Sequence, residues 1–117
     1  MAGAWEVRLS RAAEADLQNV YGWTADRFGD AQTAIYSRIV SGALAALADG
    51  PRTPGARRRD DVGAGLFTMH ASGRGRRARH LFLFRLGRHD GDRIVEVPRV
   101  LHDSMDLPRH VPPMDEG

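Results

Sequence analysis

Two amphipathic helices joined by a single glycine constrain this chain more than any other feature of its sequence. Apolar side chains recur every three or four positions over residues 10–28 and again over residues 31–48, and a helix with one apolar stripe has to bury it against another layer. Ser10 can cap the first helix and Asp30 the second, while Gly29 suits the left-handed conformation that ends a helix. The spacing therefore predicts a tight helical hairpin.

The stripe of each predicted helix identifies the side chains expected to face inward. In the first helix these are Ala13, Leu17, Val20, Tyr21, Thr24 and Phe28. In the second they are Ile35, Ile39, Gly42, Ala43, Ala46 and Leu47, with Tyr36, Val40 and Leu44 widening the stripe. The run Asp49-Gly50-Pro51 should end the second helix, because glycine and proline interrupt its hydrogen bonding.

The apolar segments outside the hairpin have the composition of β-strands. Residues 5–9 alternate apolar and charged side chains, which is typical of a half-buried strand. Further strands, forming an antiparallel meander, are expected at residues 66–71, 78–86 and 93–101. A turn at Asp90-Gly91 should join the last two strands. Pro98 cannot donate to a ladder, so it should lie in a bulge, at a strand end or on an edge.

The resulting order, β-α-α-β-β-β, predicts an α+β fold in which the helical hairpin packs on one face of a small, mainly antiparallel sheet. A chain of 117 residues is long enough for one domain, expected over residues 1–110. Residues 52–63 and 72–77 are expected to be surface loops, because they are rich in polar residues and glycine. Residues 111–117 are expected to form a disordered tail.

The composition excludes several classes of protein. There is no cysteine, which rules out disulfide bonds and thiolate chemistry. The five histidines show neither an HxxxH nor an HExxH spacing, so neither a metal nor another cofactor is expected. No apolar run approaches the ~20 residues that span a bilayer, and the first residues carry no secretory signal. We therefore expect a cytoplasmic protein that has no contact with a membrane.

Arginine supplies every basic side chain of this sequence. All 17 basic residues are Arg, and residues 52–88 contain ten of them against only Asp60 and Asp61. Ala and Gly, which GC-rich codons also favour, are abundant, so base composition accounts for the choice of Arg over Lys. The placement is more informative, because a basic central segment can meet nucleic acid, an acidic protein surface, or simply solvent.

Three strings, in this order of elements, carry a family resemblance. They are Ser10-Arg11-Ala12-Ala13-Glu14-Ala15-Asp16-Leu17, Arg59-Asp60-Asp61-Val62 and Arg99-Val100-Leu101-His102-Asp103-Ser104-Met105-Asp106. The first fits the pattern S-x-x-A-x-x-D-L, and the last resembles R-V-L-H-x-x-M-D at the end of a last strand. Over residues 5–110 the chain resembles the ParE branch of the RelE/ParE superfamily of toxins.

The resemblance implies the toxin of a type II toxin-antitoxin system, which arrests growth and is neutralised by a cognate antitoxin. ParE toxins are associated with DNA gyrase, so it implies a non-enzymatic inhibitor that binds gyrase. The partner would be an acidic-tailed, DNA-binding antitoxin, and the toxin would meet DNA only indirectly, through that antitoxin. Two alternatives stay open: a ribosome-dependent mRNA endonuclease of RelE type, and a low-potency toxin fold that acts mainly in autoregulation with its antitoxin.

Three sets of residues are candidates for these roles. Target binding is expected at Arg99, His102, Met105 and Arg109, in and after the last strand. Antitoxin binding is expected at Arg57, Arg58, Arg59, Arg74, Arg76, Arg77 and Arg79, and at Tyr36 and Val40 on the second helix. A nuclease would use Arg85, Arg99, His102 and His110, because these side chains can transfer protons and stabilise a phosphorane.

Two features count against the nuclease. Nucleases of RelE type carry a tyrosine or a His-Tyr pair near the end of the chain, whereas Tyr21 and Tyr36 both fall in the predicted helices. Asp103 and Asp106 follow the last strand, where their charges would repel a phosphate. Arg99 could instead donate to either of these carboxylates and anchor a C-terminal turn. The sequence leaves both roles open for this arginine.

Overall fold

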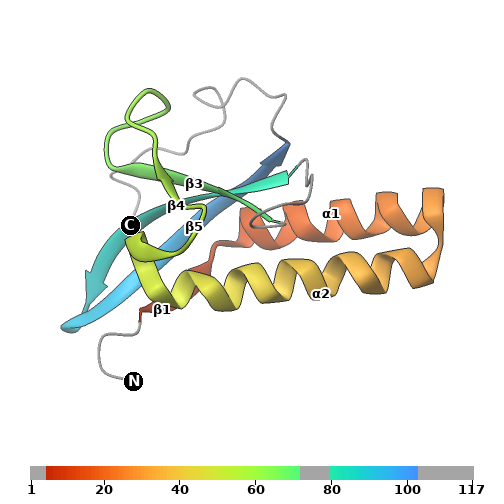
Figure 1. The fold of residues 1–117 in the computed structure, drawn as a ribbon, viewed down its shortest axis with the longest axis horizontal. Coiled ribbons are helices and arrows are strands. Elements are labelled where there is room, and N and C mark those ends of the chain that lie inside the picture. Colours follow the sequence, from red (N-terminus) through yellow and green to blue (C-terminus); the bar gives the residue numbers. More distant parts are fainter. Residues whose placement is uncertain (1–4, 72–79, 103–117) are drawn as a thin grey trace.

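A sheet of five strands with a helical hairpin on one face makes up the computed structural model, which describes residues 5–71 and 80–102 (Figure 1). The elements are β1 (Glu6–Leu9), α1 (Arg11–Phe28), α2 (Asp30–Ala46), the 3-10 helix η1 (Leu47–Arg52), β2 (Arg57–Arg58), β3 (Leu66–His70), β4 (His80–His89) and β5 (Asp92–His102). The strand order is β1-β5-β4-β3-β2. β1 pairs with β5 in parallel and every other pair is antiparallel. The predicted α+β class is confirmed.

The start and end of α1 follow the predicted capping. The Ser10 hydroxyl accepts a hydrogen bond from the Ala13 amide at 3.0 Å, and Gly29, with φ 86°, ends the helix. The prediction that Asp30 caps α2 is wrong, because Asp30 is already the first residue of that helix and makes no capping hydrogen bond. The Gly29 carbonyl accepts instead from the Thr33 amide at 3.2 Å. One glycine thus ends α1 and starts α2.

The inward face of α2 is rotated from the predicted one. The buried side chains of α2 and the residue after it are Val40, Ala43 and Leu47. Ile35 is 41% exposed and Gly42 is also exposed, so both were wrongly placed in the core. Phe28 was also expected inside but is 62% exposed. Phe28 and Ile35 lie within two turns of the closed end of the hairpin, which extends beyond the described strands in Figure 1, so these strands do not cover them.

The segment after α2 contains a 3-10 helix and a short strand, where the sequence predicted a helix end followed by a loop. The chain continues as η1, and Gly50 adopts φ 66° within it. A Cβ at Gly50 would collide with the ring of Trp5, so any other residue at this position would force that ring to shift. The predicted loop at residues 52–63 contains β2, whose two arginines pair with Phe67 and Thr68 of β3.

Strand β4 is buried on both faces, and two apolar cores meet across it. Phe82 and Phe84 belong to the core under the hairpin. Leu81 and Leu83 belong to a smaller cluster with Leu66, Leu101 and Val62. Because successive side chains of a strand point to opposite faces, the run Leu-Phe-Leu-Phe supplies both layers.

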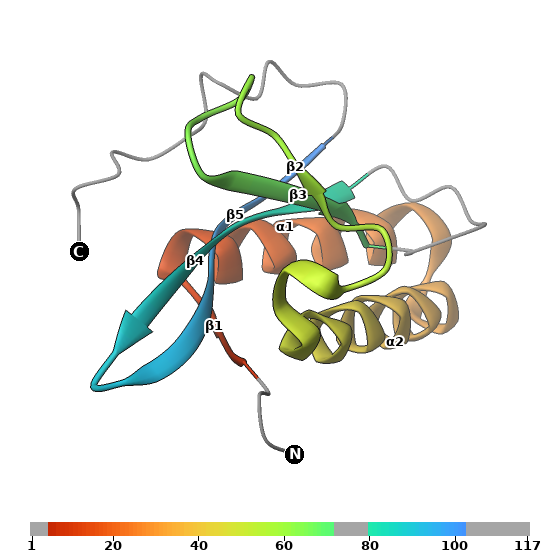
Figure 2. The same ribbon diagram turned by 60° about the vertical axis from the view of Figure 1, so that its left-hand side comes forward.

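The two irregular points of the β4–β5 hairpin agree with the prediction. Asp90 and Gly91 adopt φ 53° and 84° at its turn, which is the conformation of a tight hairpin turn, and Figure 2 shows this turn projecting away from the helices. Leu83 pairs with Arg99 but Arg85 pairs with Glu96, so two residues of β5 stand opposite one of β4. Pro98 lies in this bulge. The predicted loop at residues 72–77 and tail at residues 111–117 lie outside the described residues.

Candidate functional site

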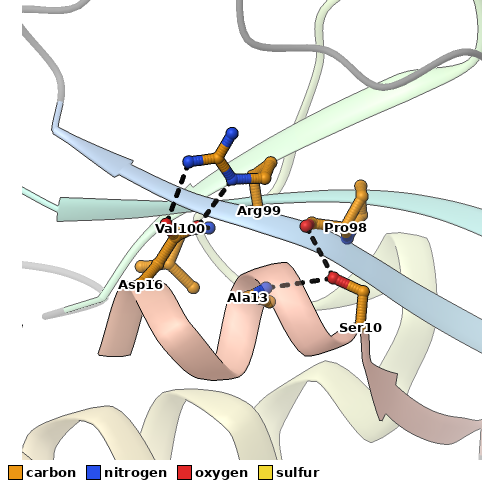
Figure 3. A network of polar contacts seen from close by, with 6 residues as sticks. All are labelled: Ser10, Ala13, Asp16, Pro98, Arg99 and Val100. Carbon is orange, nitrogen blue, oxygen red and sulfur yellow. Dashed lines mark hydrogen bonds and ion pairs between the residues drawn. The ribbon is translucent and has the colours of Figure 1, made fainter. Parts of the chain in front are cut away.

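Helix α1 takes over as the neighbour of β5 where strand β1 ends. The parallel pairing stops at Leu9 and Val97, and beyond that point none of the described strands borders β5 on this side. The Ser10 hydroxyl donates to the Pro98 carbonyl at 2.7 Å. The Val100 amide donates to the Asp16 carboxylate at 2.9 Å (Figure 3). Side chains of α1 therefore satisfy backbone groups that a buried edge cannot leave unpaired.

Asp16 also holds the side chain of Arg99. The Arg99 Nε donates to one carboxylate oxygen at 2.8 Å and Nη2 donates to the other at 2.9 Å. The side chains of Arg99 and Asp16 are 28% and 15% exposed, respectively. The hydrogen bonds that Arg99 donates to Asp16 raise the pKa of Arg99 above its ordinary value, so the guanidinium stays charged. The partner of Arg99 is thus Asp16, whereas the predicted partners Asp103 and Asp106 lie outside the described residues.

The two ends of the family resemblance meet at this joint. Ser10 and Asp16 come from the opening pattern, and Arg99 and Val100 from the closing string. Ala13, the remaining small residue of the opening pattern, is 0% exposed under the sheet. The contact with β5 thus uses a polar side chain at the N-cap of α1 and another at Asp16, with the buried Ala13 between them. We call the set Ser10, Asp16, Pro98, Arg99 and Val100 the α1–β5 joint.

A second polar cluster lies where β4 begins and β5 ends. His80 and His102 pair across the two strands, with their rings edge to face at 5.4 Å. The Tyr36 hydroxyl lies 3.1 Å from Nδ1 of His80. Burial raises the pKa of Tyr36 to about 12, so its hydroxyl is protonated near neutral pH. Both tyrosines lie in helices as predicted, and Tyr36 packs against the core as its place in the inward stripe predicted. Its contact with His80, 44 positions away, was not predicted.

The four candidate nuclease residues do not form one site in the described part of the chain. Arg85 is bound to Glu96 at 2.7 Å. Glu96 and His102 are six residues apart on β5, which is about 20 Å of extended strand. Arg99 has its Nε–Nη2 edge occupied by Asp16, and His110 lies outside the described residues.

The basic segment before β3 is largely neutralised within itself. Arg58 pairs with Asp60 at 3.0 Å and Arg59 with Asp61 at 2.9 Å. A hydrogen bond from the Gly65 amide lowers the pKa of Asp60 most, and the hydrogen bond and charge of Arg58 lower it further. The side chain of Arg59 lowers the pKa of Asp61. Both carboxylates are therefore charged at neutral pH.

The remaining candidates for partner contacts differ in accessibility. Arg57 is exposed on the outermost strand. Val40 is 2% exposed and belongs to the core, so a partner cannot reach it in this fold, whereas Tyr36 is half-buried against His80. The candidates Arg74, Arg76, Arg77, Arg79, Met105 and Arg109 lie outside the described residues.

A scan against known families matches residues 7–107 to the family described as "ParE toxin of type II toxin-antitoxin system, parDE". The chain belongs to the ParE toxin family. The match spans both strings that meet at the α1–β5 joint. The chain is thus the toxin component of a type II toxin-antitoxin system, and its partner is an antitoxin.

Individual ParE relatives agree with this assignment, and a solved structure agrees with the fold. The chain is 32% identical over 104 residues to "Toxin ParE1" of Caulobacter vibrioides, covering 89% of this chain and 95% of that protein. It is 31% identical over 103 residues to "Toxin ParE1" of Mycobacterium tuberculosis, covering 88% and 94%. The solved structure "Chromosomal ParDE TA system from P. aeruginosa" matches with a TM-score of 0.67 and 17% identity, covering 86% of this chain and 98% of that one. At that identity the structure supports the fold alone.

The described part of this ParE-family chain contains neither a candidate metal site nor a candidate membrane-spanning helix. Residues 5–71 and 80–102 bring together no group of three side chains that could hold a metal ion. None of the described helices is both long and apolar enough to cross a membrane.

Proposed function

We propose that this ParE-family toxin arrests growth by binding DNA gyrase in the cytoplasm, with no bond chemistry of its own. The observation that carries this proposal is the separation of the nuclease candidates. Arg85 is paired with Glu96, far along the sheet from His102, and Arg99 is held by Asp16. A phosphoryl-transfer site would need such groups gathered around one phosphate.

The proposal assigns partner contacts to accessible residues of the described part of the chain and to candidates that lie outside it. Target binding would use Arg99 and His102, followed by Met105 and Arg109 in the C-terminal segment. The acidic tail of a DNA-binding antitoxin would meet Arg57 and, after exchange of their internal ion pairs, Arg58 and Arg59. The half-buried Tyr36 remains a candidate antitoxin contact, as do Arg74, Arg76, Arg77 and Arg79. The toxin itself would then meet DNA only through the antitoxin.

A ribosome-dependent mRNA endonuclease is the second candidate function. The cluster of Tyr36, His80 and His102 favours it, because two imidazoles at one end of a sheet are suited to proton transfer near neutral pH. Tyr36 would not serve as a base there, since its pKa is about 12. A low-potency toxin that acts mainly in autoregulation remains the third candidate.

The test compares two activities of the same preparation of antitoxin-free protein. One assay measures inhibition of gyrase supercoiling and trapping of cleaved DNA, and the other measures cleavage of mRNA in a translating ribosome extract. We expect gyrase inhibition with intact mRNA. A His80→Phe variant, which keeps an aromatic ring but removes the imidazole, should inhibit gyrase like the wild type.

The opposite pattern would overturn the gyrase proposal. Codon-phased mRNA cleavage by the wild type, lost in His80→Phe, would establish the endonuclease. Expression of the chain without growth arrest, together with inactivity in both assays, would favour the low-potency candidate.

A further inference from the structure

We propose that Asp16 is a positioning residue for Arg99, and that the guanidinium it holds binds a carboxylate on the protein target of the toxin. This inference rests on the proposed function, in which Arg99 belongs to the target-binding surface. It goes further by giving Asp16 a role in binding and by naming the chemistry of the group that is bound.

The first argument is the edge of Arg99 that stays open. A guanidinium has two edges that match a carboxylate, one formed by Nε and Nη2 and one by Nη1 and Nη2. Asp16 occupies the first, at 2.8 and 2.9 Å. Nη1 makes no hydrogen bond to any described residue, and Figure 3 shows it pointing away from Asp16. Because the Arg99 side chain is 28% exposed, a partner carboxylate can approach this second edge.

The second argument is that Asp16 is itself fixed. Its oxygen that accepts from Arg99 Nε also accepts from the Val100 amide at 2.9 Å, and its side chain is only 15% exposed. The orientation of the guanidinium is therefore set by the backbone of β5. A free arginine would lose rotamer freedom when a partner bound, whereas this one has lost it on folding.

The ion pair with Asp16 has a further consequence for how the target is bound. The pair has no net charge, so it attracts a distant anion only weakly. The ion pair instead presents the Nη1–Nη2 edge of Arg99 as two hydrogen-bond donors in a fixed direction. Recognition at this point should depend on geometry, and replacement of Arg99 by lysine should not preserve it, since an ammonium group lacks the second edge.

The test separates positioning from stability with one conservative substitution. In Asp16→Asn the amide oxygen can still accept from the Val100 amide, but the amide nitrogen can no longer accept from Arg99. We would compare Asp16→Asn, Arg99→Gln and the double variant by the expression level needed to arrest growth, by gyrase inhibition, and by melting temperature. Asp26→Asn, an exposed aspartate of the same helix, is the matched control.

We expect Asp16→Asn and Arg99→Gln each to weaken potency at least about tenfold. The double variant should be no weaker than Arg99→Gln alone, and Asp26→Asn should equal the wild type. Arg99→Lys should lose potency as Arg99→Gln does, which keeps the idea testable if Asp16→Asn folds poorly.

Several outcomes would overturn the inference. Wild-type potency in Asp16→Asn, with only a lower melting temperature, would make Asp16 a structural residue. A further loss in the double variant would show that Asp16 acts independently of Arg99, and full potency of Arg99→Gln would remove Arg99 from the target surface. Growth arrest without gyrase inhibition would instead reject the proposed target, while the comparison of variants could still be made on growth arrest.

Discussion

The residue types at the α1–β5 joint follow from its geometry, because β5 extends beyond the end of its neighbour β1. An unpaired buried backbone group costs about 1–3 kcal/mol. Serine at the N-cap has a hydroxyl that accepts from Ala13 and donates to Pro98 at the same time. The side chain of aspartate is short enough to be held against the strand. Its two oxygens together accept three hydrogen bonds, two from Arg99 and one from Val100. Ser10 thus caps α1 and satisfies the edge of β5 together, while Asp16 links α1 to that edge.

Tyr36 gives a testable consequence at the scale of one residue. Its folded-state pKa is raised from 10.0 to about 12, so its contribution to stability is fully present below pH 10 and is lost as the pH rises through 12. The loss should reach at most about 2 kcal/mol, since each unit is worth about 1.4 kcal/mol and the site is partly screened. Urea unfolding between pH 8 and pH 12 measures it, and Tyr36→Phe should flatten the decline. An equally steep decline in Tyr36→Phe would assign the effect to other groups.

Elements were easier to predict from the sequence than the way they face each other. The periodicities of α1 and α2, the glycine between them and the turn at Asp90-Gly91 depend on neighbours a few positions apart, and the structure confirms them. The face of α2 depends on what packs against it. Ile35 satisfies the helical spacing yet is 41% exposed, because it lies in the second turn of α2, near the closed end of the hairpin that extends beyond the described strands. β2 was missed because two arginines carry no strand periodicity.

Two glycines in neighbouring elements should respond oppositely to the same substitution. Gly42 lies inside α2 with nothing near its would-be Cβ, so Gly42→Ala should stabilise by about 0.5–1 kcal/mol through helix propensity. Gly50 lies in η1 with φ 66°, where a Cβ would meet the Trp5 ring, so Gly50→Ala should destabilise by about 1–3 kcal/mol. Thermal unfolding of both variants measures this. Stabilisation by Gly50→Ala would show that the Trp5 ring does not lie over this turn.

Contacts between distant parts of the chain determine which side chains the whole molecule presents to a partner. The sequence could not predict these contacts. Asp16 and Arg99 are 83 positions apart, and Tyr36 and His80 are 44 apart, so no local pattern could pair them. Three consecutive arginines suggested a strongly basic surface. Two of them pair with Asp60 and Asp61, which follow at once in the sequence. The described surface around residues 57–61 is therefore less basic than three consecutive arginines suggest.

Removing the ion pairs of Arg58 and Arg59 tests where an acidic antitoxin binds. The double variant Asp60→Asn, Asp61→Asn would release Arg58 and Arg59 from their internal ion pairs. If the antitoxin docks here, its association rate at low salt should rise by roughly 2- to 10-fold and fall more steeply with added salt. The control is Asp26→Asn with Asp30→Asn, which changes the net charge equally at the exposed hairpin tip. An equal gain in association rate in both double variants would reflect net charge alone. A gain only in the variant of Asp60 and Asp61 would place the antitoxin's acidic segment beside β2. The reason is that a local charge acts within about a Debye length, roughly 10 Å at 0.1 M salt.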